Sequence, residues 1–213
     1  MKKGGRYDTS GLIEDQYEPG SGGRVLRNLL GINAKREMDQ AETEALKRAE
    51  GAFFRTYSRT HRFTSSDICR MHKVWLGEIY AWAGSYRQVK IGKGAFSFAF
   101  PAQIPKLMSG LDEDSLRRHT PCGSGSKERI VQALSEVHVE LLLIHPFREG
   151  NGRLARVLAT LMALQAGLPP PDFRSIKGKR KQEYFSAVRA GMDRNYTPMA
   201  EVFSEVLRKN LGA

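Results

Sequence analysis

The sequence KERIVQALSEVHVELLLIHPFREGNGRLARVLATLMALQ, residues 127–165, contains two strongly apolar segments joined by a short polar one. Over residues 127–144 apolar side chains occupy nearly every side of a helix, and residues 154–165 predict a second apolar helix. A helix that is apolar on most sides belongs in the middle of a helical bundle. This stretch therefore predicts an all-α fold with these two helices at its centre.

Helical spacing of apolar residues continues on both sides of the central pair. Residues 86–100 are the exception, because apolar and polar residues alternate there and Gly92-Lys93-Gly94 supplies a turn. Residues 1–35 lack helical periodicity and are rich in Gly, which predicts a turn-rich arm. We therefore expect one small β-hairpin between helices that cover residues 34–53, 67–84, 105–119, 181–192 and 199–210.

Length and composition limit the class of protein. At roughly 150 residues per domain, the 213 residues predict one domain, and the net charge of +11 favours anionic partners. No apolar run approaches the ~20 residues of a membrane-spanning helix, and no apolar region follows the basic residues 1–6, so we expect neither a membrane protein nor a secretory signal. Two widely spaced cysteines, Cys69 and Cys122, argue against a disulfide scaffold and indicate the reducing cytoplasm.

The polar segment 145–156 carries the chemistry. Pro146 disfavours helix at His145, which places the imidazole at the mouth of a loop. Gly150 and Gly152 flank Asn151 just before a helix, a sequence that exposes consecutive backbone N–H groups at the positive end of a helix dipole. This part of the segment predicts an anion-binding loop.

Four charged or titratable side chains surround that loop. Arg153 and Arg156 are three residues apart, so both are expected on one helix face as a clamp for phosphate oxygens. Glu149 offers the carboxylate oxygen that Mg²⁺ prefers, and Mg²⁺ commonly arrives with phosphates. His145 can accept a proton near neutral pH. The segment therefore predicts a site for phosphate chemistry.

The segment HPFREGNGRLAR, residues 145–156, resembles the HxFx(D/E)GNGRxxR signature of the Fic family of protein AMP-transferases at every defined position. Tyr80-Ala81-Trp82-Ala83-Gly84 followed by Arg87 is similar to the sequence that precedes the flap in this family. The resemblance implies a helical bundle with a β-hairpin flap. It also implies an N-terminal arm (1–25), a catalytic domain (26–206) and a C-terminal tail (207–213).

The resemblance implies a reaction and roles for the charged residues. His145 would deprotonate a Tyr, Ser or Thr hydroxyl of a target protein, which then attacks the α-phosphate of ATP. Mg²⁺ on Glu149 would hold the charge of the departing pyrophosphate. Arg153 and Arg156 would hold the β- and γ-phosphates.

The same resemblance assigns the remaining site. The backbone of Gly150, Asn151 and Gly152 would cradle the phosphates, with the Asn151 amide as an extra contact, and Phe147 would anchor the loop. The flap would pair with an extended segment of the target by strand addition; its residues are Val89, Lys90, Ile91, Gly92, Lys93, Gly94, Ala95 and Phe96.

Several alternatives stay open. Neither Ser10–Asp15 nor Thr197–Val202 fits the [S/T]xxxE[G/N] motif that restrains many relatives, so we expect restraint by a separate antitoxin-like protein, with Glu14 as a degenerate inhibitor the alternative. The same scaffold could transfer UMP, phosphate or phosphocholine. A basic nucleic-acid-binding module with a vestigial site is the rival from another class, although no nucleic-acid-reading motif supports it. The expected location is the cytoplasm, or that of a host cell if the protein is a delivered effector.

Overall fold

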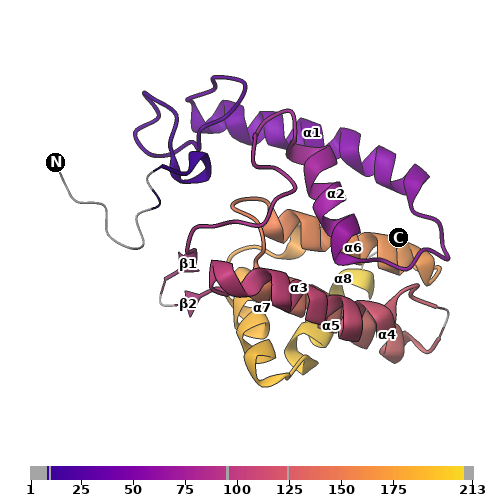
Figure 1. Ribbon diagram of the computed structural model, residues 1–213. Helices are drawn as coiled ribbons and strands as arrows, with labels where there is room; N and C mark the ends of the chain where they lie inside the picture. The colour runs from indigo at the N-terminus through magenta and orange to yellow at the C-terminus, as the bar shows by residue number, and fades with distance from the viewer. Residues whose placement is uncertain (1–8, 10, 95, 124, 209–213) are drawn as a thin grey trace.

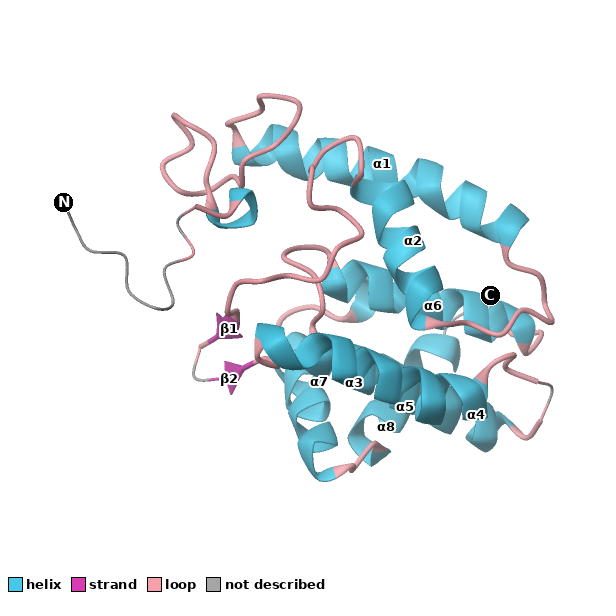
Figure 2. Ribbon diagram, viewed as in Figure 1, coloured by secondary structure: helices cyan, strands magenta, loops and turns pink. Residues whose placement is uncertain are grey.

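The computed structural model describes residues 9, 11–94, 96–123 and 125–208. These residues form a helical bundle with a single two-stranded hairpin, which confirms the predicted all-α fold (Figures 1 and 2). None of the described helices combines the length and apolar character that crossing a membrane requires. The longer helices are α1 (Lys35–Thr56), α2 (Ser65–Leu76), α3 (Ile104–Leu111), α5 (Lys127–Ile144), α6 (Asn151–Gln165), α7 (Lys179–Ala190) and α8 (Thr197–Arg208).

Helix α5 is the centre of the bundle, where it packs against α3, α6, α7 and α8 (Figure 1). It begins at Ser126, whose hydroxyl accepts the Arg129 N–H. Apolar side chains on every side of α5 are buried, as the sequence predicted. Helix α6 lies alongside and adds its apolar face to the same core. A π-helical turn (Asp112–Leu116) and the short α4 (Arg117–His119) continue α3 before α5 begins.

Helix α2 ends at Leu76, well before the predicted end near Gly84. Residues 77–84 form a compact turn in which Trp82 is buried. Gly84 has a φ of +86°, which a right-handed helix excludes, and a Cβ there would lie 2.8 Å from Lys73 Cβ. The close approach of this turn to α2 therefore requires glycine at position 84.

The predicted hairpin is present but shorter than the segment 86–100. Strand β1 (Gly92–Lys93) pairs antiparallel with β2 (Phe96–Ser97), with Gly92 opposite Ser97 and Lys93 opposite Phe96. Ala95, which the sequence assigned to the flap, lies outside the described residues.

One side chain bonds to both ends of the hairpin. The carbonyls of Val89 and Ala99, on either side of the hairpin, both accept hydrogen bonds from the Arg87 guanidinium at 2.7 Å. Regular strand pairing is confined to the tip between these two residues.

The described part of the N-terminal arm is turn-rich, as predicted, and packs on the bundle. It contains a 3-10 turn (Ile13–Asp15) and a β-bridge between Tyr17 and Leu26. The bridge crosses the predicted boundary between residues 25 and 26, and Leu26 is buried in the common core. The division into 1–25, 26–206 and 207–213 stays a prediction, and residues 1–8, 10 and 209–213 lie outside the described residues.

Candidate active site

The chain reverses direction between α5 and α6 through the polar residues 145–150. His145 ends α5 in a left-handed conformation (φ 52°, ψ 60°), and Gly150, with φ 86°, precedes the first residue of α6. A Cβ at Gly150 would lie 2.8 Å from the Trp75 ring, so only glycine fits this approach. The reversal places the imidazole and the N-terminus of α6 on the same loop.

Helix α6 begins at Asn151, three residues earlier than predicted. Asn151, Gly152 and Arg153 therefore form its first turn, where backbone N–H groups have no acceptor within the helix. These groups and the helix dipole favour an anion at this end. The earlier start strengthens the predicted anion-binding loop.

The Asn151 side chain braces the loop. Its Oδ1 accepts the Phe147 N–H at 2.9 Å, and its Nδ2 donates to the Phe147 carbonyl at 2.7 Å. Both ends of the buried amide are thereby used inside the loop. These bonds use one lone pair of Oδ1 and one N–H of Nδ2, so the contact between this amide and a nucleotide stays a prediction beside that of the Asn151 backbone N–H.

A cavity of about 570 Å³ opens in front of the loop, between the flap, α6 and α7. It brings together many of the sequence-predicted site residues, namely His145, Glu149, Gly150, Asn151, Gly152 and Arg156 with Ile91, Gly92, Lys93, Gly94 and Phe96 of the flap. Val89 and Lys90 are not among its lining residues, and Val89 is buried.

Sequence reasoning missed the lining that α7 supplies. Tyr184, Phe185, Val188 and Arg189 face the cavity, at the i, i+1, i+4, i+5 spacing of one helix face. That spacing is visible in the sequence, but nothing local indicates that α7 packs beside the loop. Phe98, predicted only as part of a strand, lines the cavity as well.

The His145 imidazole is held by two contacts. The Phe98 ring stacks on it at a centroid distance of 3.7 Å, and Nδ1 lies 3.2 Å from the Leu142 carbonyl. Because a carbonyl only accepts, Nδ1 carries the proton and Nε2 keeps its lone pair. Burial lowers the pKa of His145 to about 4, although the Leu142 hydrogen bond opposes this shift. The ring is therefore neutral at pH 7 and can accept a proton at Nε2.

Arg156 has no carboxylate partner among the described residues. Its guanidinium carbon lies 5.5 Å from the Phe173 ring centroid and 5.7 Å from that of Tyr184. Its Nε is buried without a hydrogen-bond partner in the described part of the chain. A cation on the cavity wall with unused donor capacity is suited to an anionic ligand.

Arg153 is placed differently, although it lies only one helical turn away. Its Nη2 donates to Glu42 Oε2 of α1 at 2.6 Å, lies 3.3 Å from Glu149 Oε1, and its guanidinium covers the Trp75 ring. The buried Glu42 also accepts the Tyr80 hydroxyl at 2.6 Å. Arg153 is not among the cavity's lining residues, so of the two arginines only Arg156 lines the cavity, and a clamp formed by both stays a prediction.

Glu149 is the acidic residue of the cavity. Its side chain is 46% exposed, and Oε1 accepts the Gly150 N–H at 2.8 Å. The described residues contain no cluster of three His, Cys, Asp or Glu able to hold a metal ion. One accessible carboxylate nevertheless fits Mg²⁺, which usually keeps several waters and takes its remaining ligands from substrate phosphates.

The carbonyl of Glu149 is fixed by a histidine that the sequence did not single out. His72 Nδ1 accepts the Gly84 N–H at 2.8 Å, so Nε2 carries the proton and donates to the Glu149 carbonyl at 3.1 Å. The His72 ring stacks on Phe147 at 3.9 Å. Burial lowers the pKa of His72 to about 4, so its imidazole is neutral at pH 7.

Comparison with known proteins identifies relatives of the chain. The family model described as Fic/DOC family matches residues 62–163. The chain is 32% identical over 153 residues to "Probable protein adenylyltransferase y4lH" of Sinorhizobium fredii, covering 68% of this chain and 74% of the relative. It is 31% identical over 192 residues to "Protein adenylyltransferase VbhT" of Bartonella schoenbuchensis, covering 88% of this chain but 37% of that longer protein.

Solved structures share the fold. The Bartonella tribocorum effector BepC, crystallised with AMPPNP, superposes with a TM-score of 0.71 at 21% identity, over 92% of this chain and 97% of that chain. A Fic domain of an effector from Bartonella sp. AR 15-3 gives a TM-score of 0.73 at 21% identity, over 91% of both chains. At this identity the likeness shows the architecture, including the helical bundle and its hairpin.

Three neutral histidines make stability depend on pH. Burial lowers the pKa of His72 and His145 to about 4 and that of His138 to about 3. Between about pH 6.5 and 4 the unfolded chain then binds more protons, so the free energy of unfolding falls as the pH falls, by about 1.4 kcal/mol per pH unit for each group. The pKa values of the Glu14 and Glu50 carboxyl groups are raised, which opposes this fall in stability. These are two groups against three histidines, so the histidines dominate.

We therefore expect urea unfolding to give a free energy several kcal/mol lower at pH 5 than at pH 7. In the folded protein, ¹⁵N NMR should find the three imidazoles neutral at pH 5.5. Equal unfolding free energies at the two pH values, with these rings already protonated at pH 6, would contradict the burial described here.

Proposed function

Because the chain belongs to the Fic/DOC family, we propose that it is a protein adenylyltransferase, which transfers AMP from ATP to a hydroxyl group of a target protein and releases pyrophosphate. One observation carries this proposal: a neutral imidazole that keeps its lone pair at Nε2 faces the same cavity as the start of α6 and an arginine without an acidic partner in the described part of the chain. The names of the relatives as protein adenylyltransferases support it.

The nucleotide is the anion that this cavity accepts. Backbone N–H groups at the start of α6 hold phosphate oxygens, and Arg156 holds the γ-phosphate, whose charge it can take without first leaving a carboxylate. Glu149 is the residue that would hold Mg²⁺ together with those phosphates, and the ion would supply positive charge for the pyrophosphate. The Gly150 N–H bonds to Oε1 of this carboxylate, and Oε2 could bind the metal without loss of that bond.

The protein's part in the chemical step is a proton transfer. His145 Nε2 removes the proton of a Tyr, Ser or Thr hydroxyl of the target, and that oxygen forms a bond to the α-phosphorus of ATP. The bond between the α-phosphorus and the bridging oxygen breaks, pyrophosphate leaves, and AMP stays on the target. Leu142 and Phe98 hold the ring so that Nε2 is the accepting atom.

Arg153 stays a predicted phosphate contact. Its guanidinium is bonded to Glu42 at 2.6 Å, so it reaches a phosphate only if that ion pair opens.

The flap is the proposed docking site for the target. An extended segment of the target would pair as an additional strand with the short, exposed strand β1. Val89 is buried and acts as an anchor of the flap rather than as a contact.

We further propose a cytoplasmic site of action, in this cell or in a host cell, where ATP is present and the free cysteines Cys69 and Cys122 stay reduced. The favoured partner is a target protein rather than nucleic acid. Transfer of UMP, phosphate or phosphocholine by the same site is the alternative, and the next experiment separates AMP transfer from phosphate transfer.

Incubation of the purified chain and Mg²⁺ with a bacterial lysate as acceptor tests the reaction. Label from α-³²P-ATP is expected on protein, and label from γ-³²P-ATP is not, since pyrophosphate departs. His145→Ala should lower the α-label by at least about a thousandfold, because the general base is lost, while the melting temperature stays close to that of the wild type. Transfer of the γ-label, or full transfer by His145→Ala, would contradict the proposal.

The same assay distinguishes nucleotide binding from chemistry. Arg156→Ala removes a phosphate contact and is expected to raise the KM for ATP by about ten- to hundredfold. Arg129→Ala, which removes an exposed arginine at the start of α5, is the matched control and should leave KM unchanged. An equal effect of both variants would assign the loss to net charge rather than to the site.

Restraint by a separate protein is favoured over restraint by Glu14. The Glu14 carboxylate accepts the Gln88 N–H at 2.6 Å, and the Glu14 carbonyl accepts Arg148 Nε at 2.8 Å. These bonds tie Glu14 to the base of the flap, while Arg156 has no carboxylate partner among the described residues. We propose that an antitoxin-like partner supplies the acidic side chain that competes for Arg156.

Glu14→Gln tests this assignment because it keeps a hydrogen-bond acceptor for Gln88 and removes the charge. We expect AMP transfer within about twofold of the wild type, measured with α-labelled ATP. An increase of tenfold or more would identify Glu14 as an internal inhibitor and remove the reason for a separate one.

A further inference from the structure

Arg87 is a buried cation at the junction of three backbone segments. Its side chain is 1% exposed. Nε donates to the His145 carbonyl, Nη1 to the Val89 carbonyl and Nη2 to the Ala99 carbonyl, each at 2.7 Å. Nη2 also lies 3.4 Å from the Ile144 carbonyl. Each of the three guanidinium nitrogens thus donates to the carbonyl of a different backbone segment.

The charge of Arg87 is compensated mainly by carbonyl dipoles. Ile144 is the last residue of α5 and His145 its C-terminal cap, and the C-terminal end of a helix carries a partial negative charge. Burial lowers the pKa of Arg87, and the nearby Glu14 carboxylate opposes that shift. Such a burial is tolerated only when the donors are satisfied, so the arrangement of these carbonyls is tightly constrained.

The contacts of Arg87 span the whole flap. Val89 precedes β1 and Ala99 follows β2, so one guanidinium holds both ends of the hairpin. The third contact is the backbone of His145 itself. Phe98, next to Ala99, stacks on the His145 ring at 3.7 Å. The position of the flap relative to the imidazole is therefore set through Arg87.

We propose that Arg87 is a positioning residue, which clamps both ends of the flap to the backbone of His145 and so fixes where a target docked on the flap presents its hydroxyl to Nε2. The proposal rests on the proposed function for the identity of the target's group. A lysine cannot replace arginine here, because its single ammonium group lacks the rigid fork that reaches three directions.

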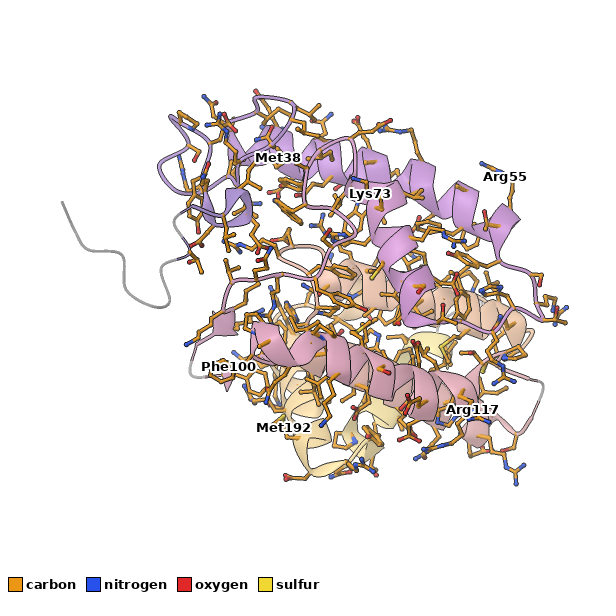
Figure 3. The ribbon with its side chains drawn as sticks, in the orientation of Figure 1. Met38, Arg55, Lys73, Phe100, Arg117 and Met192 are labelled. Atoms are coloured by element: carbon orange, nitrogen blue, oxygen red, sulfur yellow. The ribbon has the colours of Figure 1, made fainter. Side chains whose placement is uncertain are left out.

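The test variant is Arg87→Lys, which keeps the positive charge at the end of α5. Arg55→Lys is the matched control, since Arg55 is exposed at the far end of α1, away from the side of the molecule where Phe100 lies (Figure 3). In Arg87→Lys we expect kcat/KM for AMP transfer to lysate proteins to fall at least about tenfold. The Kd for a non-hydrolysable ATP analogue should stay within about threefold of the wild type, because the start of α6 and Arg156 do not contact Arg87.

A readout independent of transfer uses NMR of the His145 ring. Loosening the flap should disturb the Phe98 stack and admit water, so the imidazole should titrate at a higher pH in Arg87→Lys than in the wild type. The charged groups that act on this ring are Arg87, Glu149 and Lys93, and the substitution leaves all three charges in place. Arg55→Lys should titrate as the wild type does.

The outcomes separate the two proposals. An unchanged His145 titration and unchanged transfer in a folded Arg87→Lys protein would overturn the positioning role. Parallel losses of stability, ATP-analogue affinity and transfer would also overturn it, because they would make Arg87 a structural residue only. A wild type that transfers no AMP, with the His145 titration still shifted in Arg87→Lys, would contradict the proposed function and leave the clamp intact.

If Arg87→Lys proves too unstable to assay, Phe98→Ala reports on the same coupling. It removes the stack between flap and imidazole while keeping every bond of Arg87, and it should raise the pH at which His145 titrates. Failure of that titration to move would show that the flap does not control the ring, which overturns the proposal by a second route.

Discussion

The reversal of the chain between α5 and α6 is the constraint on which the site depends. It joins the end of one central helix, where His145 takes a left-handed conformation, to the beginning of the next, where Gly150 does the same. Both helices are buried in one core, so the loop between them cannot shift without moving the bundle. The proposed base, His145, and the proposed anion-binding start of α6 are thereby separated by only five residues of loop, and the surrounding elements hold both in place.

That support comes from side chains that bond to backbone rather than to ligand. Asn151 pairs with Phe147, His72 bonds to the Glu149 carbonyl, and Arg87 bonds to the His145 carbonyl. Each of these side chains is buried, and its polar atoms form hydrogen bonds to backbone groups. The loop is rigid because these bonds replace the regular hydrogen bonds that helices would supply. By contrast, Nε2 of His145 keeps its lone pair, and Nε of Arg156 has no hydrogen-bond partner among the residues that the structure describes.

The sequence predicted the central helices, the hairpin and the loop that carries the motif, because apolar periodicity, glycines and proline act locally. It could not predict that Arg153 and Arg156 have different partners, since Glu42 lies on α1, far away in sequence. It also missed α7 as a cavity wall. The predicted end of α2 near Gly84 was wrong, because the helix ends at Leu76 and residues 77–84 fold into a turn that packs Trp82 into the core. Errors of this kind come from tertiary contacts that no local pattern encodes.

A crystal structure with Mg²⁺ and α,β-methylene-ATP would show whether the start of α6 binds the triphosphate. Phosphate oxygens should lie about 2.7–3.1 Å from the N–H groups of Asn151 and Gly152, with the γ-phosphate at Arg156 and the α-phosphate toward His145 Nε2. A triphosphate bound elsewhere, with the start of α6 making no contact to it, would contradict the account.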